Sequence, residues 1–452
     1  TPQLPHGWHY TADRSAVMVR LAPSSITTHT FHVSVPETAV ATQPYFLRTA
    51  RTGAMYSWQR VADSVRALPF QPADVAVDIT LDPGAEIRLR RAAEFAVVDK
   101  ALGELRRPLL VVPAAAVSVE PHVAVIPAGA SSPRSVTVIV QAARDGMSGV
   151  LRLETPPGWS VRPAAVDVML RSAGESRAVA FDVTPPVDAI GESALRARFE
   201  SAGRVYGVGY THIDYPHIRP QPLYRQAVVR AVVFPVQIAR DLRIGYIDGA
   251  GDDGAAALRQ LGATVETLDA AALASGDLAS FDAIVAGIRA YEVRPDLIIS
   301  NDRLIDYVRG GGTFIVQYNK YELVDGGFMP YPATMTRPHG RVTDENAAVA
   351  LIDPDHPALS WPNRITPGDF GGWVQERGLY FLDTFDDRYQ ALLSMADPGE
   401  SAQTGSLVVA PVGDGWYVYT GLALFRQLPE AVPGAFRLLA NLVSLGQARP
   451  VP

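Results

Sequence analysis

Alternating apolar and polar positions predict β-strands through the first quarter of the chain. The alternation is clearest over residues 28–35 and 75–81, and it places one face of each strand against a core and the other in water. Asp82-Pro83-Gly84 is typical of a turn, because proline presets one backbone angle and glycine accepts a positive φ. We therefore predict a β-sandwich-like module over residues 1–110.

A second β-rich module is predicted over residues 111–235. Short strands, such as 117–121, 135–140 and 178–183, recur between turn-forming residues. This spacing is typical of an immunoglobulin-like β-sandwich. Trp159 is expected to pack in its core.

The pattern changes after Asp241, where strands and helices begin to alternate. The expected strands are 243–247, 264–268, 282–286 and 313–317, the expected helices are 254–261, 302–309 and 435–445, and the segments 406–410 and 416–420 are expected to form a hairpin. Strands separated by helices favour a parallel sheet. We therefore predict a multidomain protein in which an α/β doubly wound, flavodoxin-like domain over residues 236–452 follows two β-sandwich modules.

Charge and composition narrow the classes of partner. The 452 residues carry a formal net charge of -7 and no basic run, so nucleic acid is not expected as a ligand. The longest apolar stretches, such as 109–117, are shorter than the ~18 residues that a membrane-spanning helix needs. Because the chain opens at Thr1, we expect that a signal peptide was removed and that the protein is periplasmic or extracellular.

Several kinds of catalytic centre find no support in the sequence. The chain has no cysteine, which excludes disulfides, thiolate nucleophiles and cysteine-ligated metals. It also lacks a G-x-S-x-G nucleophile motif. Asp353, Asp355 and His356 could hold a cation, but a proline-set loop before a short helix is the favoured interpretation. We expect no metal, no cofactor and no complete catalytic site.

Residues Gly249 to Gly254 match the glycine pattern of a dinucleotide-binding loop and lie between a predicted strand and a predicted helix. In such loops the backbone N–H groups at the helix start bind a pyrophosphate. However, Asp252 and Asp253 stand inside the loop and would repel phosphate. A tight turn with an acidic N-cap is therefore favoured.

Polar residues follow the predicted parallel strands, at the edge where open α/β sheets bind ligands. They are Asp248, Asp252 and Asp253 after the first strand, Arg289 and Tyr291 after the third, and Gln317, Tyr318 and Asn319 after the fourth. Asp369, Trp373, Glu376 and Arg377 of a long insertion are expected to close over the same crevice. Charged, amide and aromatic groups together are typical of a pocket for a sugar-like or other polar ligand. The alternative is that these groups form hydrogen bonds that hold long loops in place.

Five segments of the last module carry a resemblance to a known family. They are residues 245–252, 287–291, 317–319, 341–346 and 371–378. Together they resemble the non-catalytic region downstream of the catalytic domain in large secreted bacterial PIG-L (LmbE-like) deacetylases. The resemblance implies that the middle module is similar to an immunoglobulin-like module found after some α-galactosidase domains, and the last to a glutamine-amidotransferase-like, or ThuA-like, domain. The family's His-Pro-Asp-Asp zinc motif does not occur in this sequence.

Three hypotheses about function follow. In the first, the chain is a non-catalytic binding or scaffold protein, with protein partners that include a membrane complex at its extracytoplasmic face. In the second, it is an accessory carbohydrate-binding region of a deacetylase of N-acetylated sugars whose catalytic domain lies outside this sequence. In the third, the crevice of the last module is an active site that uses Asp and Glu.

Overall fold

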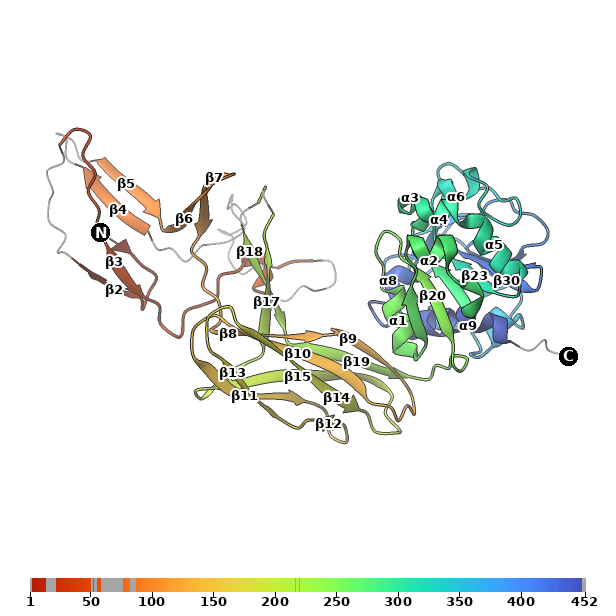
Figure 1. Cartoon of the computed structure of the whole chain (residues 1–452), viewed down its shortest axis with the longest axis horizontal. Helices are drawn as coiled ribbons and strands as arrows, with labels where there is room; N and C mark the ends of the chain where they lie inside the picture. The colour runs from red at the N-terminus through yellow and green to blue at the C-terminus, as the bar shows by residue number, and fades with distance from the viewer. Residues whose placement is uncertain are drawn as a thin grey trace.

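The computed structural model describes residues 2–13, 22–49, 52, 55–57, 76–81, 87–215, 217–218 and 220–448. Figure 1 shows three parts in chain order: an arm of small sheets, a β-sandwich and a domain of helices and strands. The predicted turn at Asp82-Pro83-Gly84 lies outside the described residues.

The arm, residues 2–108, differs from the sandwich expected over residues 1–110. Its elements are β1 (Pro2–Gln3), β2 (His9–Ala12), β3 (Phe31–Ser34), η1 (Tyr45–Leu47), β4 (Ala76–Leu81), β5 (Ile87–Ala92), β6 (Glu94–Asp99) and β7 (Gly103–Pro108). The described strands pair as three separate sheets, β1-β4-β5, β2-β3 and β6-β7. Among the residues of the arm whose burial is described, Trp8, Thr42 and Pro44 are the buried ones. The expected strands are present, and they pair within three separate small sheets.

The middle part is a two-sheet sandwich of the immunoglobulin-like kind. Its strands are β8 (Ala115–Glu120), β9 (Val123–Pro127), β10 (Arg134–Ala142), β11 (Met147–Glu154), β12 (Ser160–Arg162), β13 (Val166–Leu170), β14 (Ser176–Thr184), β15 (Gly191–Ser201), β16 (Arg204–Tyr206) and β19 (Val228–Phe234). One sheet has the order β12-β14-β10-β8 and the other β13-β11-β15-β19-β9. Alternate residues of both sheets, among them Val138 and Phe199, share one core, against which Trp159 packs as expected. A further hairpin, β17 (Val208–Ile213) with β18 (Gln221–Gln226), extends from the sandwich toward the arm (Figure 1).

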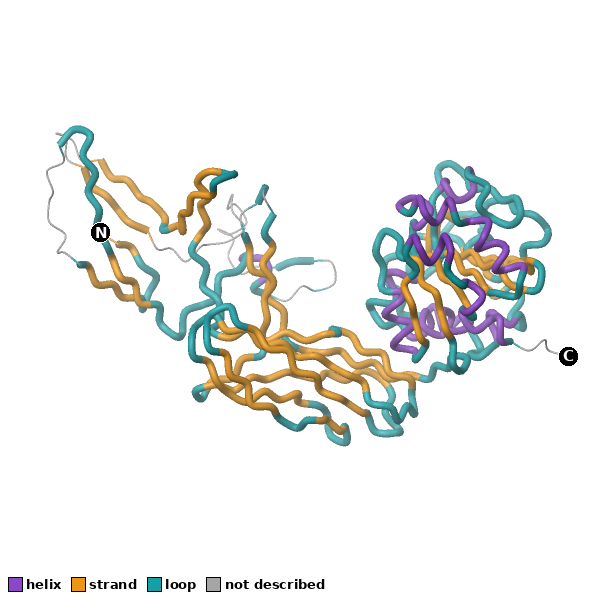
Figure 2. Tube along the Cα trace, viewed as in Figure 1, coloured by secondary structure: helices purple, strands orange, loops and turns teal. Residues whose placement is uncertain are grey.

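The last part contains a seven-stranded sheet of the order β21-β20-β22-β23-β30-β29-β27. The first five strands of this order are parallel. Its strands are β20 (Arg243–Ile247), β21 (Thr264–Thr267), β22 (Ala283–Ala286), β23 (Thr313–Val316), β27 (Gln390–Ala391), β29 (Leu407–Val412) and β30 (Gly415–Thr420). Figure 2 shows helices beside these strands, in contrast to the strand-only sandwich.

The helices of this domain cover both faces of the sheet. They are α1 (Gly254–Leu261), α2 (Ala270–Ser275), η3 (Leu278–Ser280), α3 (Ala290–Val293), α4 (Pro295–Ile299), α5 (Asn301–Arg309), α6 (Tyr321–Asp325), α8 (Leu424–Gln427), α9 (Pro433–Ser444) and η5 (Leu445–Gln447). Ile315 and Val418 pack with α1 and α9 in one core, whereas Phe314 and Tyr417 pack with α5 in a second core. Successive residues of a strand point to opposite faces of the sheet, so alternate residues enter the two cores. The domain therefore has three layers, with the sheet between two layers of helices.

An insertion between β23 and β29 lies against this domain. It holds β24 (Gly340–Val342), β25 (Val349–Leu351), α7 (Pro357–Ser360), η4 (Pro367–Phe370), β26 (Gly378–Phe381) and β28 (Leu393–Met395). β24 pairs with β26 and β25 with β28. Pro357 opens α7 and the His356 side chain caps it, which confirms the predicted proline-set loop before a short helix.

The sandwich contacts the α/β domain directly. The backbone N–H of Val125 donates to Gln260 Oε1 at 2.6 Å, and Arg134 Nη2 donates to Gln260 O at 3.0 Å. Phe234 of β19 packs on Phe436 of α9, with ring centroids 6.0 Å apart. Apolar burial therefore continues from the sandwich into the core around α1 and α9.

Candidate ligand site at the carboxyl edge of the parallel sheet

The chain order reverses between β20 and β22, and open α/β sheets bind ligands at such a point, beyond the carboxyl ends of the strands. Here that position is filled by the protein itself. Asp252, after β20, accepts hydrogen bonds from the N–H groups of Gly254 and Ile288, both at 2.9 Å. These bonds tie the loop after β20 to the loop after β22. A Cβ on Gly249 would lie 2.0 Å from Ile288 O, so glycine is required for this close approach.

Asp252 also occupies the position that a phosphate would take in a dinucleotide-binding loop. Its carboxylate, rather than a phosphate, accepts from the N–H at the start of α1. Asp253 stands at the N-cap position but its side chain makes no capping bond, so the expected acidic cap comes from the preceding residue. The Tyr246 hydroxyl donates to Asp252 and accepts from Gln317 Nε2 at 2.9 Å. Burial raises the pKa of Tyr246 well above its ordinary value, and the Asp252 charge adds to this effect.

Two other predicted residues after β22 and β23 are buried and bonded within the fold. Tyr291 donates its hydroxyl to Asn301 at 2.7 Å, and its N–H donates to Asn319 Oδ1 at 2.9 Å. Tyr291 is 1% exposed and Asn319 is 0% exposed. Together with the buried Gln317, these side chains hold the two loops and do not line an open crevice, which corrects the prediction.

The residues expected from the insertion also have structural partners. Trp373 is buried, and its indole N–H donates to Asp369 O at 3.1 Å. Arg377 is 5% exposed and donates to Ala347 O at 2.8 Å and to Phe370 O. Burial lowers the pKa of the Arg377 guanidinium. These contacts hold the insertion together, as the loop-holding alternative predicted.

Two of the carboxylates on which the enzyme hypothesis depends, Asp252 and Glu376, are hydrogen-bonded to other parts of the protein. Asp252 accepts the bonds described above, and Glu376 accepts from Arg426 Nε at 2.5 Å. Asp248 and Asp253 are exposed. Arg294 donates to Asp248 O at 3.2 Å and forms an ion pair with Asp296 at 2.6 Å.

Arg289, another of the predicted residues, is part-exposed and lies beside other ionisable groups. It has a φ of 55°, a left-handed conformation that is uncommon for residues other than glycine and clusters at functional sites. Glu292 accepts from Arg289 Nη2 at 2.6 Å and from Lys320 Nζ at 3.0 Å. The Arg289 hydrogen bonds lower the pKa of Glu292 to about 2. The three side chains form a fixed charge cluster that carries one net positive charge.

A ring cluster lies next to these charges, at the carboxyl ends of β23 and β30. Tyr318 follows β23 and stacks on Tyr380, with centroids 5.6 Å apart. Tyr419, near the end of β30, donates its hydroxyl to Tyr380 O at 2.5 Å. His339 stacks on the same ring at 3.9 Å, with 5° between the planes. Tyr380 also has a φ of 55°, so a second residue of this surface is in the strained left-handed region.

Burial and charge tune the ionisable rings of this cluster. Burial raises the pKa of Tyr318, while the Arg289 charge acts in the opposite direction. Burial raises the pKa of Tyr380 as well. Burial, followed by the charge of Arg341, lowers the pKa of His339. The cluster therefore keeps two protonated hydroxyls and a neutral imidazole at neutral pH.

A groove of about 620 Å³ begins at His339 and continues the cluster. Its lining includes the polar residues Thr336, Arg341, Asp383, Glu400, Ser401, Gln403 and Thr404, and the buried apolar residues Phe381 and Leu382. Its volume falls within the range of about 300–1,000 Å³ typical of small-molecule sites. We define the carboxyl-edge site as this groove together with Arg289, Glu292, Tyr318, Lys320 and Tyr380.

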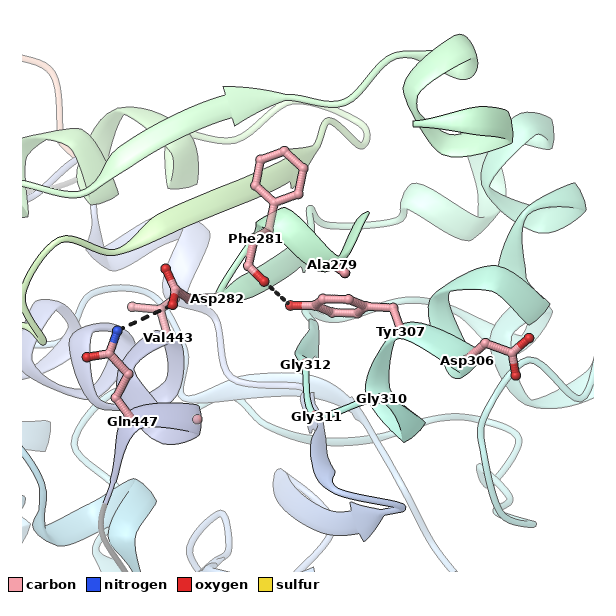
Figure 3. A pocket seen from close by; sticks show the side chains of 11 residues that line it. Ala279, Phe281, Asp282, Asp306, Tyr307, Gly310, Gly311, Gly312, Val443 and Gln447 are labelled. Carbon is pink, nitrogen blue, oxygen red and sulfur yellow. Dashed lines mark hydrogen bonds between the residues drawn. The ribbon is translucent and has the colours of Figure 1, made fainter. Parts of the chain in front are cut away.

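A second pocket, of about 330 Å³, lies at the opposite end of the sheet (Figure 3). It is lined by Asp282, before β22, and by Gly312, before β23. Tyr307 donates its hydroxyl to Phe281 O at 3.1 Å, and Gln447 Nε2 donates to Asp282 at 3.4 Å. Because the amino ends of parallel strands are not where such sheets bind ligands, the carboxyl edge is the stronger candidate.

Part of the carboxyl-edge site was absent from the sequence prediction. Glu292 lies three residues after Arg289 on a short helix, and this spacing brings opposite charges together, so the pair was accessible from the sequence. Tyr380 and His339 are brought together by the pairing of β24 with β26, and Gln403 joins them through its hydrogen bond to Arg341 O. The sequence gives no local signal for either contact.

Within the described residues, no group of three or more His, Asp or Glu side chains is placed to hold a metal ion. No described helix is long and apolar enough to cross a membrane.

Comparisons with known proteins give no family assignment. No family model and no curated protein match the chain. Among solved structures, it is similar to the cold-adapted β-galactosidase from Rahnella sp. R3, with 17% identity, 42% of this chain and 30% of that chain covered, and a TM-score of 0.27. The β-galactosidase from Bacillus circulans sp. alkalophilus is 14% identical, with 46% of this chain and 31% of that chain covered and a TM-score of 0.28. WR4, an MSP family member of C. elegans, is 12% identical, with 26% of this chain and 97% of that chain covered and a TM-score of 0.16. The chain thus aligns to about three tenths of each β-galactosidase, and likenesses at these scores carry no functional argument.

Proposed function

We propose that this chain is a non-catalytic recognition protein that acts outside the cytoplasm and binds carbohydrate at its carboxyl-edge site. The observation that carries the proposal is the groove, whose lining combines hydroxyl, amide, carboxylate and guanidinium groups with the apolar residues Phe381 and Leu382. Sugars present hydroxyls to such polar groups and C–H surfaces to apolar ones. In this proposal the α/β domain is flavodoxin-like or amidotransferase-like. Its parallel strands β21-β20-β22-β23-β30 have the order 2-1-3-4-5 in support of that fold.

The groove and the ring cluster support a single binding surface because His339 belongs to both. Gln403 Nε2 donates to Arg341 O at 2.9 Å, which positions one groove wall against β24. The Gln403 carbonyl oxygen is left for a ligand hydroxyl. In this arrangement the polar groups select the ligand, and no nucleophile or general base is required.

The test is glycan binding by the purified chain and by single variants. We expect the parent to bind a subset of oligosaccharides on an array. His339→Ala should weaken that binding by about tenfold, a loss of about 1.4 kcal/mol. His212→Ala is the matched control, since this histidine is exposed on the β17–β18 hairpin. If no glycan binds, or if the two variants bind equally, the proposal fails.

A second candidate function, a scaffold contact with a protein partner, is favoured by the arm. Twelve of the 22 exposed large apolar side chains of the described residues lie before residue 111, including Phe95 and Val98 of β6 and Leu102. Within the described residues β6 pairs only with β7, and an isolated two-stranded sheet is marginally stable in water. A protein strand could pair the free backbone groups of β6 as well as cover its side chains, which a lipid surface cannot do.

Crosslinking in the native cell envelope tests this contact. A partner protein should crosslink to the parent and be lost with Phe95→Asp and Val98→Asp, while Thr211→Asp on the exposed face of another hairpin keeps it. Recovery of the same protein with all three variants, or of no protein at all, would remove this candidate.

A further inference from the structure

The charge cluster of the carboxyl-edge site, formed by Arg289, Glu292 and Lys320, lies among hydrogen-bond donors that have no partner in the part of the chain that the structure describes. Glu292 already accepts two bonds from Arg289, at 2.7 and 2.6 Å, and one from Lys320. Within the described residues, the Arg289 Nη1 group and the hydroxyls of Tyr318 and Tyr380 have no hydrogen-bond partner. The ammonium of Lys320 carries three N–H groups and spends one of them on Glu292.

The unused groups at this point are therefore mainly donors. They surround a cluster that carries one net positive charge, in a chain whose formal net charge is -7. The cluster is held in place rather than floating, because Glu292 ties together the loops after β22 and β23, and Arg289 N–H donates to Tyr318 O at 2.9 Å. Fixed donors around a positive charge stabilise an acceptor-rich anion.

We propose that the carbohydrate bound at the carboxyl edge is acidic, and that its anionic group lies against Arg289, Lys320 and Tyr318. This inference rests on the proposed function and adds the ligand's charge to it. The groove beyond His339, which contains Asp383 and Glu400 as well as hydroxyls, then receives the neutral hydroxyl-bearing units. A carboxylate and a sulfate share the required chemistry, so the test includes both.

The sequence offers an unusually clean probe of this site. The chain has two lysines, Lys100 and Lys320, against 38 arginines. Lys320 is 29% exposed and lies in the cluster, whereas Lys100 is exposed in the turn between β6 and β7. Amine-specific labelling followed by peptide mass spectrometry therefore compares one lysine at the site with one reference lysine in the same molecule.

In the experiment, the amine-specific reagent labels the parent chain in the presence of one of three ligands. They are a uronate oligosaccharide, its carboxyl-reduced neutral counterpart, and a sulfated counterpart. We expect an acidic oligosaccharide to slow labelling of Lys320 at least threefold while Lys100 is unaffected. The neutral form should protect Lys320 less. Protection by the uronate or by the sulfate supports the proposal and identifies the anion. Equal protection by the neutral form, or no protection by any form that binds, overturns it.

Binding measurements with Lys320→Met and Lys100→Met separate this inference from the function on which it rests. We expect Lys320→Met to lose the preference for the acidic over the neutral oligosaccharide, while Lys100→Met, which lies outside the site, binds both forms as the parent does. Tyr318→Phe, which removes one donor and keeps the ring, should reduce the same preference. If the parent binds neutral and acidic forms equally, the charge inference fails and carbohydrate recognition stands. If it binds neither, the proposed function fails.

Discussion

The arm and the α/β domain use similar strand-forming sequences with opposite results. In the α/β domain, neighbouring residues of one strand, such as Phe314 and Ile315, enter two different cores. In the arm, Phe95 and Val98 of β6 stay exposed. Alternation determines that a strand has two distinct faces, but a second layer must cover a face before burial stabilises it. A segment that forms a strand therefore does not by itself form a core.

The largest expected effect compares one phenylalanine from each region. Phe314→Ala should lower the free energy of unfolding of the α/β domain by about 3–5 kcal/mol, because it empties a fully buried site. Phe95→Ala in the arm should change stability by less than about 0.5 kcal/mol, because its ring is 62% exposed. Urea unfolding followed by hydrogen exchange on peptides of each region measures both. Comparable losses at the two positions would show that the arm has a core of its own.

The next largest effect on stability compares a buried arginine with an exposed one. Arg377→Ala leaves the carbonyls of Ala347 and Phe370 without their buried donor, at a cost of about 1–3 kcal/mol for each group. The insertion should therefore open to protease. Arg364→Ala, which breaks an ion pair between exposed side chains at 2.9 Å, should cost less than about 0.5 kcal/mol. Equal protease resistance of the parent and Arg377→Ala would contradict the assigned role.

The elements of the α/β domain were largely predictable because local periodicity specifies them. The helix expected at 254–261 is α1 with the same bounds, and the expected strand 243–247 is β20. The closing helix expected at 435–445 is α9, residues 433–444. The sequence did not specify which strand faces would be buried against another layer. Alternation over residues 28–35 looks like that of the sandwich strands, although none of the four residues of β3 is buried.

The site was predicted at the correct edge with a different set of side chains. In the extended segment after β23, Gln317, Tyr318 and Asn319 are all buried, with 2%, 7% and 0% of each residue exposed. Successive residues of an extended chain point in opposite directions. Gln317 and Asn319 therefore form internal hydrogen bonds, while the Tyr318 ring stacks on Tyr380. Residue type alone does not distinguish an amide that holds a loop from one that binds a ligand.

A smaller effect on stability is expected where Asp252 ties the loop after β20 to the loop after β22, and the adjacent Asp253 provides the comparison. Asp252→Asn places an N–H₂ group among N–H donors at Gly254 and Ile288, so one acceptor is lost and the expected destabilisation is about 1–3 kcal/mol. Asp253→Asn should have no measurable effect, because its exposed side chain makes no capping bond. Faster hydrogen exchange at Ile288 in the first variant alone is the expected signature, and identical exchange in both variants would contradict it.

The smallest effect compares an ion pair of the site with one of the arm across pH. The Arg289 hydrogen bonds lower the pKa of Glu292 from 4.5 to about 2, so the contribution of this carboxylate is complete above pH 4.5 and is lost as the pH falls toward 2. Glu292→Gln should lower stability by about 0.5–1 kcal/mol at pH 7, since the side chains are partly exposed. The difference from the parent should shrink between pH 4.5 and 2.

Glu104→Gln, which removes a half-exposed partner of Arg106 in the arm, provides the comparison and should leave stability unchanged at every pH. Denaturant unfolding at several pH values measures both variants. A Glu292→Gln difference that stays constant down to pH 2 would mean that the carboxylate is not held by Arg289 and Lys320. The positive cluster would then lack the fixed geometry that sets it apart from the exposed ion pairs of the arm, because a surface charge gains selectivity only when its partners hold it still.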